Sequence, residues 1–169
     1  MKLTTAILLS AALAALQPAT AYAADTDLPL RKAGRWEQKT TMDEGGKKHE
    51  QTLTICIDAE MERNTARASD AEHKKSCAKY DVKKEGGTVV VESTCNMNGR
   101  DVESRTEMKG DFQSAFDVTI NSTTSGIQDS QSVSVKRVIE QQGKFLGDSC
   151  GDLKAGEAMG TDGTRLMVQ

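Results

Sequence analysis

Apolar and polar residues alternate near the start of the chain as they do in a half-buried β-strand. Over residues 35–42 (RWEQKTTM) every second side chain falls on one face, so that Trp36 lies opposite to Glu37. Residues 43–48 (DEGGKK) have the composition of a turn, and residues 53–57 again place apolar side chains on one face. The pattern predicts an opening β-hairpin.

The pattern changes between Asp58 and Lys75, where alanines and charges replace the alternation. Asp58 is a residue type that caps helix N-termini, and Ser69 and Glu72 have the spacing of a second capping box. We therefore expect a short helical insert, either one broken helix or two short helices, mostly solvated.

Strand periodicity returns after Cys77, and four turn signals divide the rest into five strands. Asn98-Gly99 is the strongest signal, because both residues tolerate the positive φ of a type I′ turn, and it predicts that Cys95 lies opposite Val102. The other turn signals are at 86–87 (GG), 109–111 (KGD) and 122–129 (STTSGIQD).

The alternation in these strands predicts a sheet with one wet face. Val102 and Met108 point inward, while Glu103 and its charged neighbours point outward. Arg137 is an anomaly, because it stands among the inward-facing apolar positions of the last long strand. The predicted fold is mainly β: an antiparallel meander of about seven strands that forms a curved sheet or open barrel, with one helical insert.

Residues 1–23 have the three parts of a secretory signal peptide. Lys2 is followed by an apolar run, and Ala21-Tyr22-Ala23 is an A-x-A cleavage signal, so cleavage is expected between Ala23 and Ala24. The alternative, a membrane anchor, is disfavoured because the apolar run is shorter than the ~20 residues that span a bilayer.

Cleavage would leave one domain in residues 24–150, stapled by disulfides, and a glycine-rich tail of weak pattern in 151–169. We expect the processed protein in the periplasm, with secretion from the cell as the alternative, and no transmembrane segment in it.

Composition narrows the classes of partner. The formal net charge of −3 becomes −4 when Lys2 is removed with the signal peptide, which argues against nucleic acid or an anionic membrane surface. Aromatic side chains are few and are assigned to the core, which disfavours binding by ring stacking. Those of the mature chain are Trp36, Tyr80, Phe112, Phe116 and Phe145.

Four cysteines in an exported chain predict two disulfides. We favour Cys77 with Cys95, which span one predicted hairpin, and Cys56 with Cys150, although the other connectivities stay open. A two-residue turn at 86–87 would put Ala78 opposite Cys95 and Cys77 on the other face of the sheet. The pairing of Cys77 with Cys95 therefore needs a bulge in the strand. The alternative, a zinc site that uses His73 and Cys77, is disfavoured because the chain has no CxxC pair.

One segment resembles a catalytic motif. Residues 147–151 (GDSCG) match the G-x-S-x-G pattern of hydrolases around Ser149. The histidine of a nucleophile elbow follows the serine, but His49 and His73 both precede Ser149, so we interpret the match as accidental. We expect no enzyme activity, no metal and no cofactor, and both histidines are expected to be solvated.

The order of several short motifs resembles a known family. Gly34-Arg35-Trp36-Glu37, a cysteine after the second strand, a hairpin flanked by cysteines, and the closing residues 143–150 (GKFLGDSC) are similar to the secreted bacterial proteins of domain-of-unknown-function family 3617. That family shows leucine where Arg35 stands and has no residue equivalent to Ser149. The resemblance implies an exported Gram-negative envelope protein without an assigned activity.

These observations favour a periplasmic, non-enzymatic binding or interaction module. The concave face or open end of its sheet would hold an apolar small molecule or a segment of an envelope protein. The alternative is a structural or stress-related envelope protein, and a small serine hydrolase is the least favoured hypothesis.

Overall fold

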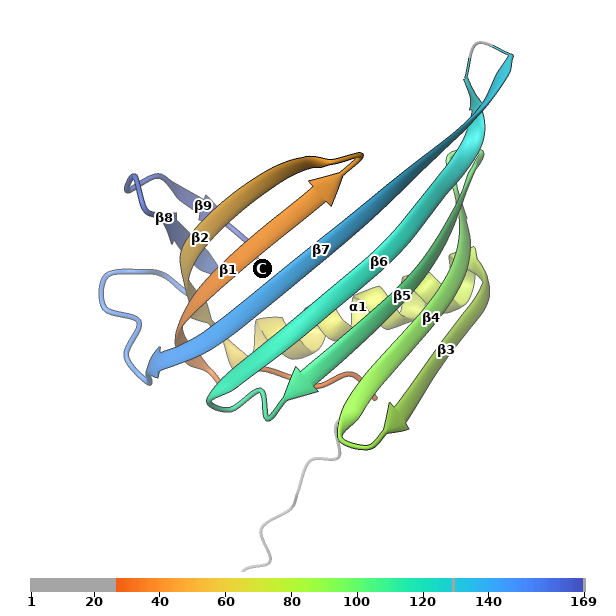
Figure 1. The fold of residues 1–169 in the computed structure, drawn as a ribbon. Coiled ribbons are helices and arrows are strands. Elements are labelled where there is room, and N and C mark those ends of the chain that lie inside the picture. Colours follow the sequence, from red (N-terminus) through yellow and green to blue (C-terminus); the bar gives the residue numbers. More distant parts are fainter. Residues whose placement is uncertain (1–26, 129, 169) are drawn as a thin grey trace, which may run out of the picture.

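The computed structural model describes residues 27–128 and 130–168, and within them the fold is one antiparallel sheet crossed by one helix (Figure 1). The predicted signal peptide and its cleavage site at Ala23 and Ala24 lie outside the described residues. The nine strands follow the order β3-β4-β5-β6-β7-β1-β2-β8-β9. The elements are β1 (Gly34–Glu44), β2 (Lys47–Ile57), α1 (Ala59–Ser76), β3 (Cys77–Glu85), β4 (Thr88–Met97), β5 (Arg100–Gly110), β6 (Ala115–Gln128), β7 (Gln131–Gly147), β8 (Glu157–Gly160) and β9 (Arg165–Met167).

The mainly β prediction is confirmed, and the sheet is open and not closed into a barrel. It has nine strands in place of about seven, because β8 and β9 form in the region expected to be a weakly patterned tail. β8 pairs with β2 over Leu53–Ile55, and β9 pairs with β8.

The predicted registers hold where the turns are short. Asn98 and Gly99 have φ values of 54° and 75°, and Cys95 pairs with Val102. The turn expected in 122–129 is wrong over most of its length, since β6 continues to Gln128. Its threonines are β-branched and fit a strand as well as a loop.

The helical insert is one continuous helix and not two. Asp58 caps it and accepts hydrogen bonds from the backbone N–H groups of Glu60 and Met61, both at 2.9 Å. Ser69 does not start a second helix, because the flanking alanines and charged residues are good helix formers. α1 lies behind the sheet in Figure 1, on the face that also carries the core.

The core lies at the end of the sheet where β1 begins. Trp36 is completely buried, and its ring centroid lies 5.6 Å from that of Phe116 and 5.4 Å from that of Phe145. Its Nε1 donates a hydrogen bond of 2.8 Å to the carbonyl of Lys32, which satisfies the buried indole. The core therefore anchors β1, β6 and β7 near one end and leaves their other ends to the surface.

Two disulfides close the fold, and they join the cysteines that the sequence favoured. Cys56 is bonded to Cys150, and Cys77 to Cys95. The β3–β4 register shifts between Cys77 and Lys79, and this irregularity brings Cys77 opposite Cys95. Because Cys150 follows β7 and Cys56 lies near the end of β2, the Cys56–Cys150 bridge ties the loop after β7 to the opening hairpin.

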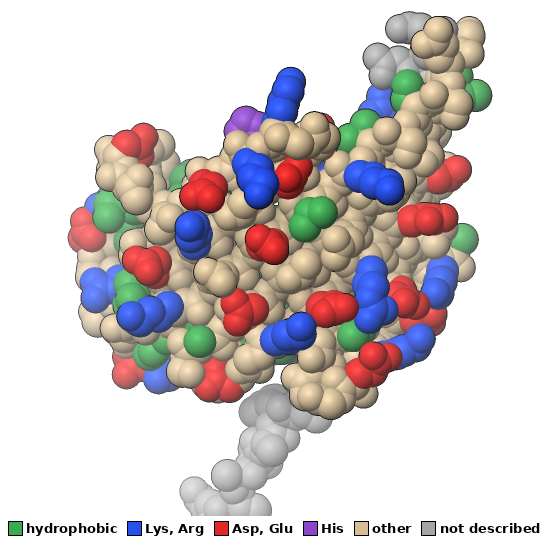
Figure 2. Space-filling view, viewed as in Figure 1, with side chains coloured by type: hydrophobic (Ala, Val, Ile, Leu, Met, Phe, Trp, Pro, Cys, Tyr) green, Lys and Arg blue, Asp and Glu red, His purple; other side chains and the backbone are tan. Residues whose placement is uncertain are grey.

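The convex face, turned to the viewer in Figure 2, carries scattered charges of both signs. Alternate residues of the strands supply them, as expected for a sheet with one wet face. In the described part of the chain no helix is long and apolar enough to cross a membrane.

Candidate functional site

Ser149 lies on the exposed loop after β7, in the segment that leads to the Cys56–Cys150 bridge. Its hydroxyl accepts a hydrogen bond of 3.3 Å from the backbone N–H of Gly151. His73 is on α1, where its Nδ1 lies 2.7 Å from the carbonyl oxygen of Ser69. The structure thus gives the serine a local turn contact and places no histidine against it among the described residues.

The structure contradicts the alternative zinc site, because Cys77 is not a free ligand. The sulfur of Cys77 is bonded to Cys95, so it has no thiolate to offer beside His73. Within residues 27–128 and 130–168, no group of three or more histidine, cysteine, aspartate or glutamate side chains is placed to hold a metal ion.

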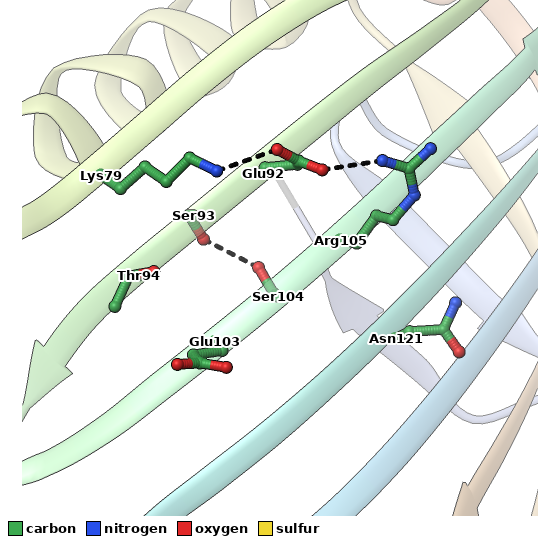
Figure 3. Close-up of a pocket in the computed structure, with 8 residues that line it drawn as sticks. All are labelled: Lys79, Glu92, Ser93, Thr94, Glu103, Ser104, Arg105 and Asn121. Carbon is green, nitrogen blue, oxygen red and sulfur yellow. Dashed lines mark hydrogen bonds and ion pairs between the residues drawn. The ribbon is translucent and has the colours of Figure 1, made fainter.

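A depression of about 390 Å³ on the convex face contains a network of paired charges (Figure 3). The Glu92 carboxylate lies between Lys79 Nζ and Arg105 Nη1, each at 2.9 Å. The hydrogen bond from Lys79 is the main cause that lowers the pKa of Glu92, and Arg105 adds to it. Since these groups satisfy one another, this exposed network is a ladder of surface ion pairs that leaves little for a ligand.

A second depression, of about 250 Å³, lies at the end of the sheet away from the core. We call it the open-end pocket. Val133 and Val135 of β7 form apolar walls, and Arg137 Nε donates to Glu44 Oε2 at 2.6 Å. The residues that line it are Glu44, Arg100, Thr124, Ser125, Gly126, Val133, Val135 and Arg137.

Arg100 gives the open-end pocket a cation that is not neutralised. Its stem lies over Gly126, where an added Cβ would come within 3.1 Å of the Arg100 Cγ. In the described part of the structure its guanidinium makes no ion pair or hydrogen bond, in contrast to the Arg137–Glu44 pair. The pocket therefore combines apolar walls with one net positive charge.

β7 presents a free edge beside this pocket. Its pairing with β1 stops where Glu44 meets Arg137, whereas its pairing with β6 continues to Gln131. Residues 131–136 thus pair with β6 on one side, and no other described segment pairs with them on the other. Figure 1 shows this end of the β6–β7 hairpin extending past the tip of β1.

Sequence reasoning found one of these residues and missed the others. Arg137 was the anomaly of the last long strand, and its partner Glu44 lies in the segment predicted to be a turn. Arg100 follows a tight turn and gave no signal of its own, and the free edge depends on the relative lengths of β1 and β7.

A third group of titratable side chains joins α1 to β3. Asp70 accepts a hydrogen bond of 2.6 Å from Lys74, which is the main cause that lowers the pKa of Asp70, and it also interacts with Tyr80. The rings of His73 and Tyr80 stack with centroids 5.2 Å apart. Burial, with the nearby negative charge of Asp70, raises the pKa of Tyr80 to about 12.

This cluster gives a direct test of how α1 is seated. In the processed protein Tyr80 would be the sole tyrosine, because Tyr22 lies in the predicted signal peptide. We expect its phenolate absorbance to appear with a midpoint near pH 12, and Asp70→Asn to lower that midpoint, with Asp81→Asn on the same strand as control. The pKa of Tyr80 in the folded protein is above the ordinary value of about 10. The contribution of protonated Tyr80 to the free energy of unfolding is therefore complete below pH ~10 and is lost as the pH rises toward 12. A midpoint at the ordinary value in the folded protein would show that Tyr80 does not dock against α1.

The comparisons with known proteins point to one family. The family described as "Protein of unknown function (DUF3617)" matches residues 31–150. No curated protein and no solved structure matches the chain. The matched range ends at the last cysteine, so β8 and β9 lie beyond it.

Proposed function

Since the chain belongs to the DUF3617 family of proteins of unknown function, its role has to be inferred from its own surfaces, and we propose that it is an exported, non-enzymatic interaction module. It binds an extended segment of a partner protein as an added strand along the free edge of β7. The observation that carries this proposal is the stretch 131–136, which is paired with β6 on one side only.

An unpaired strand edge offers a row of backbone N–H and C=O groups to another chain. Natural proteins usually protect such edges with lysines, and two other edges of this sheet follow that rule. The edge of β3 carries Lys79, Lys83 and Lys84, and the unpaired half of β2 begins with Lys47-Lys48. The β7 edge reads QSVSVK: it has alternating valines and a single lysine, Lys136, at the end where the pairing with β1 begins.

Strand addition fits this edge because affinity comes from backbone hydrogen bonds and specificity from pockets for alternate side chains. Val133 and Val135 face the open-end pocket, and Val135 is 41% exposed. A strand added to β7 would cover both valines and continue the sheet beyond the tip of β1.

The two disulfides support export. The disulfides fit an oxidising compartment, as expected for a protein exported by a signal peptide.

The second candidate function is the binding of an apolar small molecule in the open-end pocket, which the valines of that pocket favour. The volume of the pocket, about 250 Å³, is however below the usual range of roughly 300–1,000 Å³ for ligand pockets.

The test is selection of random dodecapeptides displayed on phage against the processed, disulfide-bonded protein. We expect enriched peptides rich in β-branched residues whose binding shifts the amide resonances of residues 131–136. Val135→Lys should abolish binding, because a charged lysine on an edge strand disfavours pairing with an added strand. The matched control is Val138→Lys, in a part of β7 that is paired on both sides, and it should bind normally.

Two results would refute the proposal. One is the absence of any enriched peptide, and the other is a set of peptides that bind Val135→Lys as tightly as the unaltered protein. A lipid or other apolar molecule retained in the native mass spectrum, without peptide binding, would favour the small-molecule function instead.

A further inference from the structure

The open-end pocket contains two arginines in different electrostatic states. Arg137 is neutralised by Glu44, and both side chains are about two-fifths exposed. Arg100 reaches the same pocket from β5, with its stem over Gly126, and has no counter-ion in the described part of the chain. An unmatched guanidinium beside valine walls is a receptor for an anionic group that arrives with an apolar neighbour.

We propose that Arg100 selects partner segments that carry an aspartate or glutamate on the inward face of the added strand. This inference rests on the proposed strand addition at β7, and it specifies which kind of partner side chain the open-end pocket recognises. Side chains of an added strand alternate between faces, so every second one would turn toward Val133, Val135 and the pocket. A carboxylate among them would meet the fork of donors that Arg100 presents.

The neighbouring charges sharpen this selectivity. Glu44 would repel an incoming carboxylate, but its pairing with Arg137 offsets that charge. A lysine at the same position of the partner would instead lie near two arginines. The pocket therefore favours an acidic side chain over a neutral one and disfavours a basic one.

The experiment uses one peptide from the phage selection, made in paired forms with glutamate or glutamine at each inward-facing position. Dissociation constants are measured by calorimetry for the unaltered protein, for Arg100→Gln and for Arg105→Gln. Arg105 is the matched control, because it lies on the same strand but belongs to the ion-pair network of the convex face. We expect the glutamate form to bind about ten-fold tighter at one position.

That preference should disappear in Arg100→Gln, remain in Arg105→Gln and weaken at high salt. Equal affinity for the two forms at every position would overturn the role of Arg100 while leaving strand addition intact. A preference that survives Arg100→Gln would overturn it as well. Failure of both forms to bind would instead refute the proposed function itself.

Discussion

Replacing Cys56 and Cys150 together with alanine should lower the free energy of unfolding by about 4 to 5 kcal/mol. The bridge joins residues separated by 94 positions, so it removes much of the freedom of the unfolded chain. It also fixes the loop after β7, whose next segment donates the Gly156 N–H to the Cys56 carbonyl at 3.0 Å before β8 begins. A loss of this size is a large fraction of the stability of a small domain.

The matched control is the double variant Cys77→Ala with Cys95→Ala, whose bridge spans 18 positions and should contribute about 3 kcal/mol. Urea unfolding of both variants and of the unaltered protein gives the comparison. An equal or smaller loss for the Cys56–Cys150 variant would contradict the loop-length argument. It would then point to strain in the folded state or to structure retained in the unfolded chain.

The fold was predictable where local chemistry decides the outcome. Asn98-Gly99 demanded a tight turn, and the turn set the register that places Cys95 opposite Val102. Alternation around Trp36 identified the buried face of β1, because every second side chain of a strand lies on the same face. A register shift of one residue would turn the indole to the solvent face. These features depend on a few neighbouring residues, which is why the sequence alone predicted them.

The rest depends on contacts between distant segments. β8 and β9 have little apolar pattern, and they form because the loop after β7 is tied to Cys56 and brings β8 against β2. The irregularity at Cys77 was required by the disulfide and not by any turn signal. The helix is continuous although Ser69 carries a capping signal, since helix formers surround it.

The candidate site was still harder to predict, because it arises from strand lengths and not from a motif. Nothing in residues 131–136 shows that β1 ends before reaching them. Arg137 stood out because a charge interrupted an apolar pattern, and its partner Glu44 became clear only from the β1–β7 register. Arg100 became visible only as the arginine of the pocket that lacks a partner.

Gly143→Ala should destabilise the fold by about 3 kcal/mol or more, because the glycine makes room for an aromatic ring. Gly143 pairs with Phe116 across β6 and β7, and an added Cβ would lie only 2.0 Å from the Phe116 Cε1. The ring has no space to retreat, since Phe116 is 4% exposed, stacks on Phe112 at 5.1 Å and contacts Trp36. Overpacking therefore has to shift the core or separate the strands.

A double-mutant cycle tests this cause directly. Phe116→Leu alone should destabilise by about 1 to 2 kcal/mol, and in that background Gly143→Ala should lose a large part of its effect, because the smaller side chain leaves space for the methyl group. Gln141→Ala, two positions earlier on the same face of β7, is the control and should change stability by less than about 0.5 kcal/mol. Thermal and urea unfolding measure all four variants. Additive losses for Gly143→Ala and Phe116→Leu would contradict the steric account, since they would mean that the added methyl group does not meet the ring.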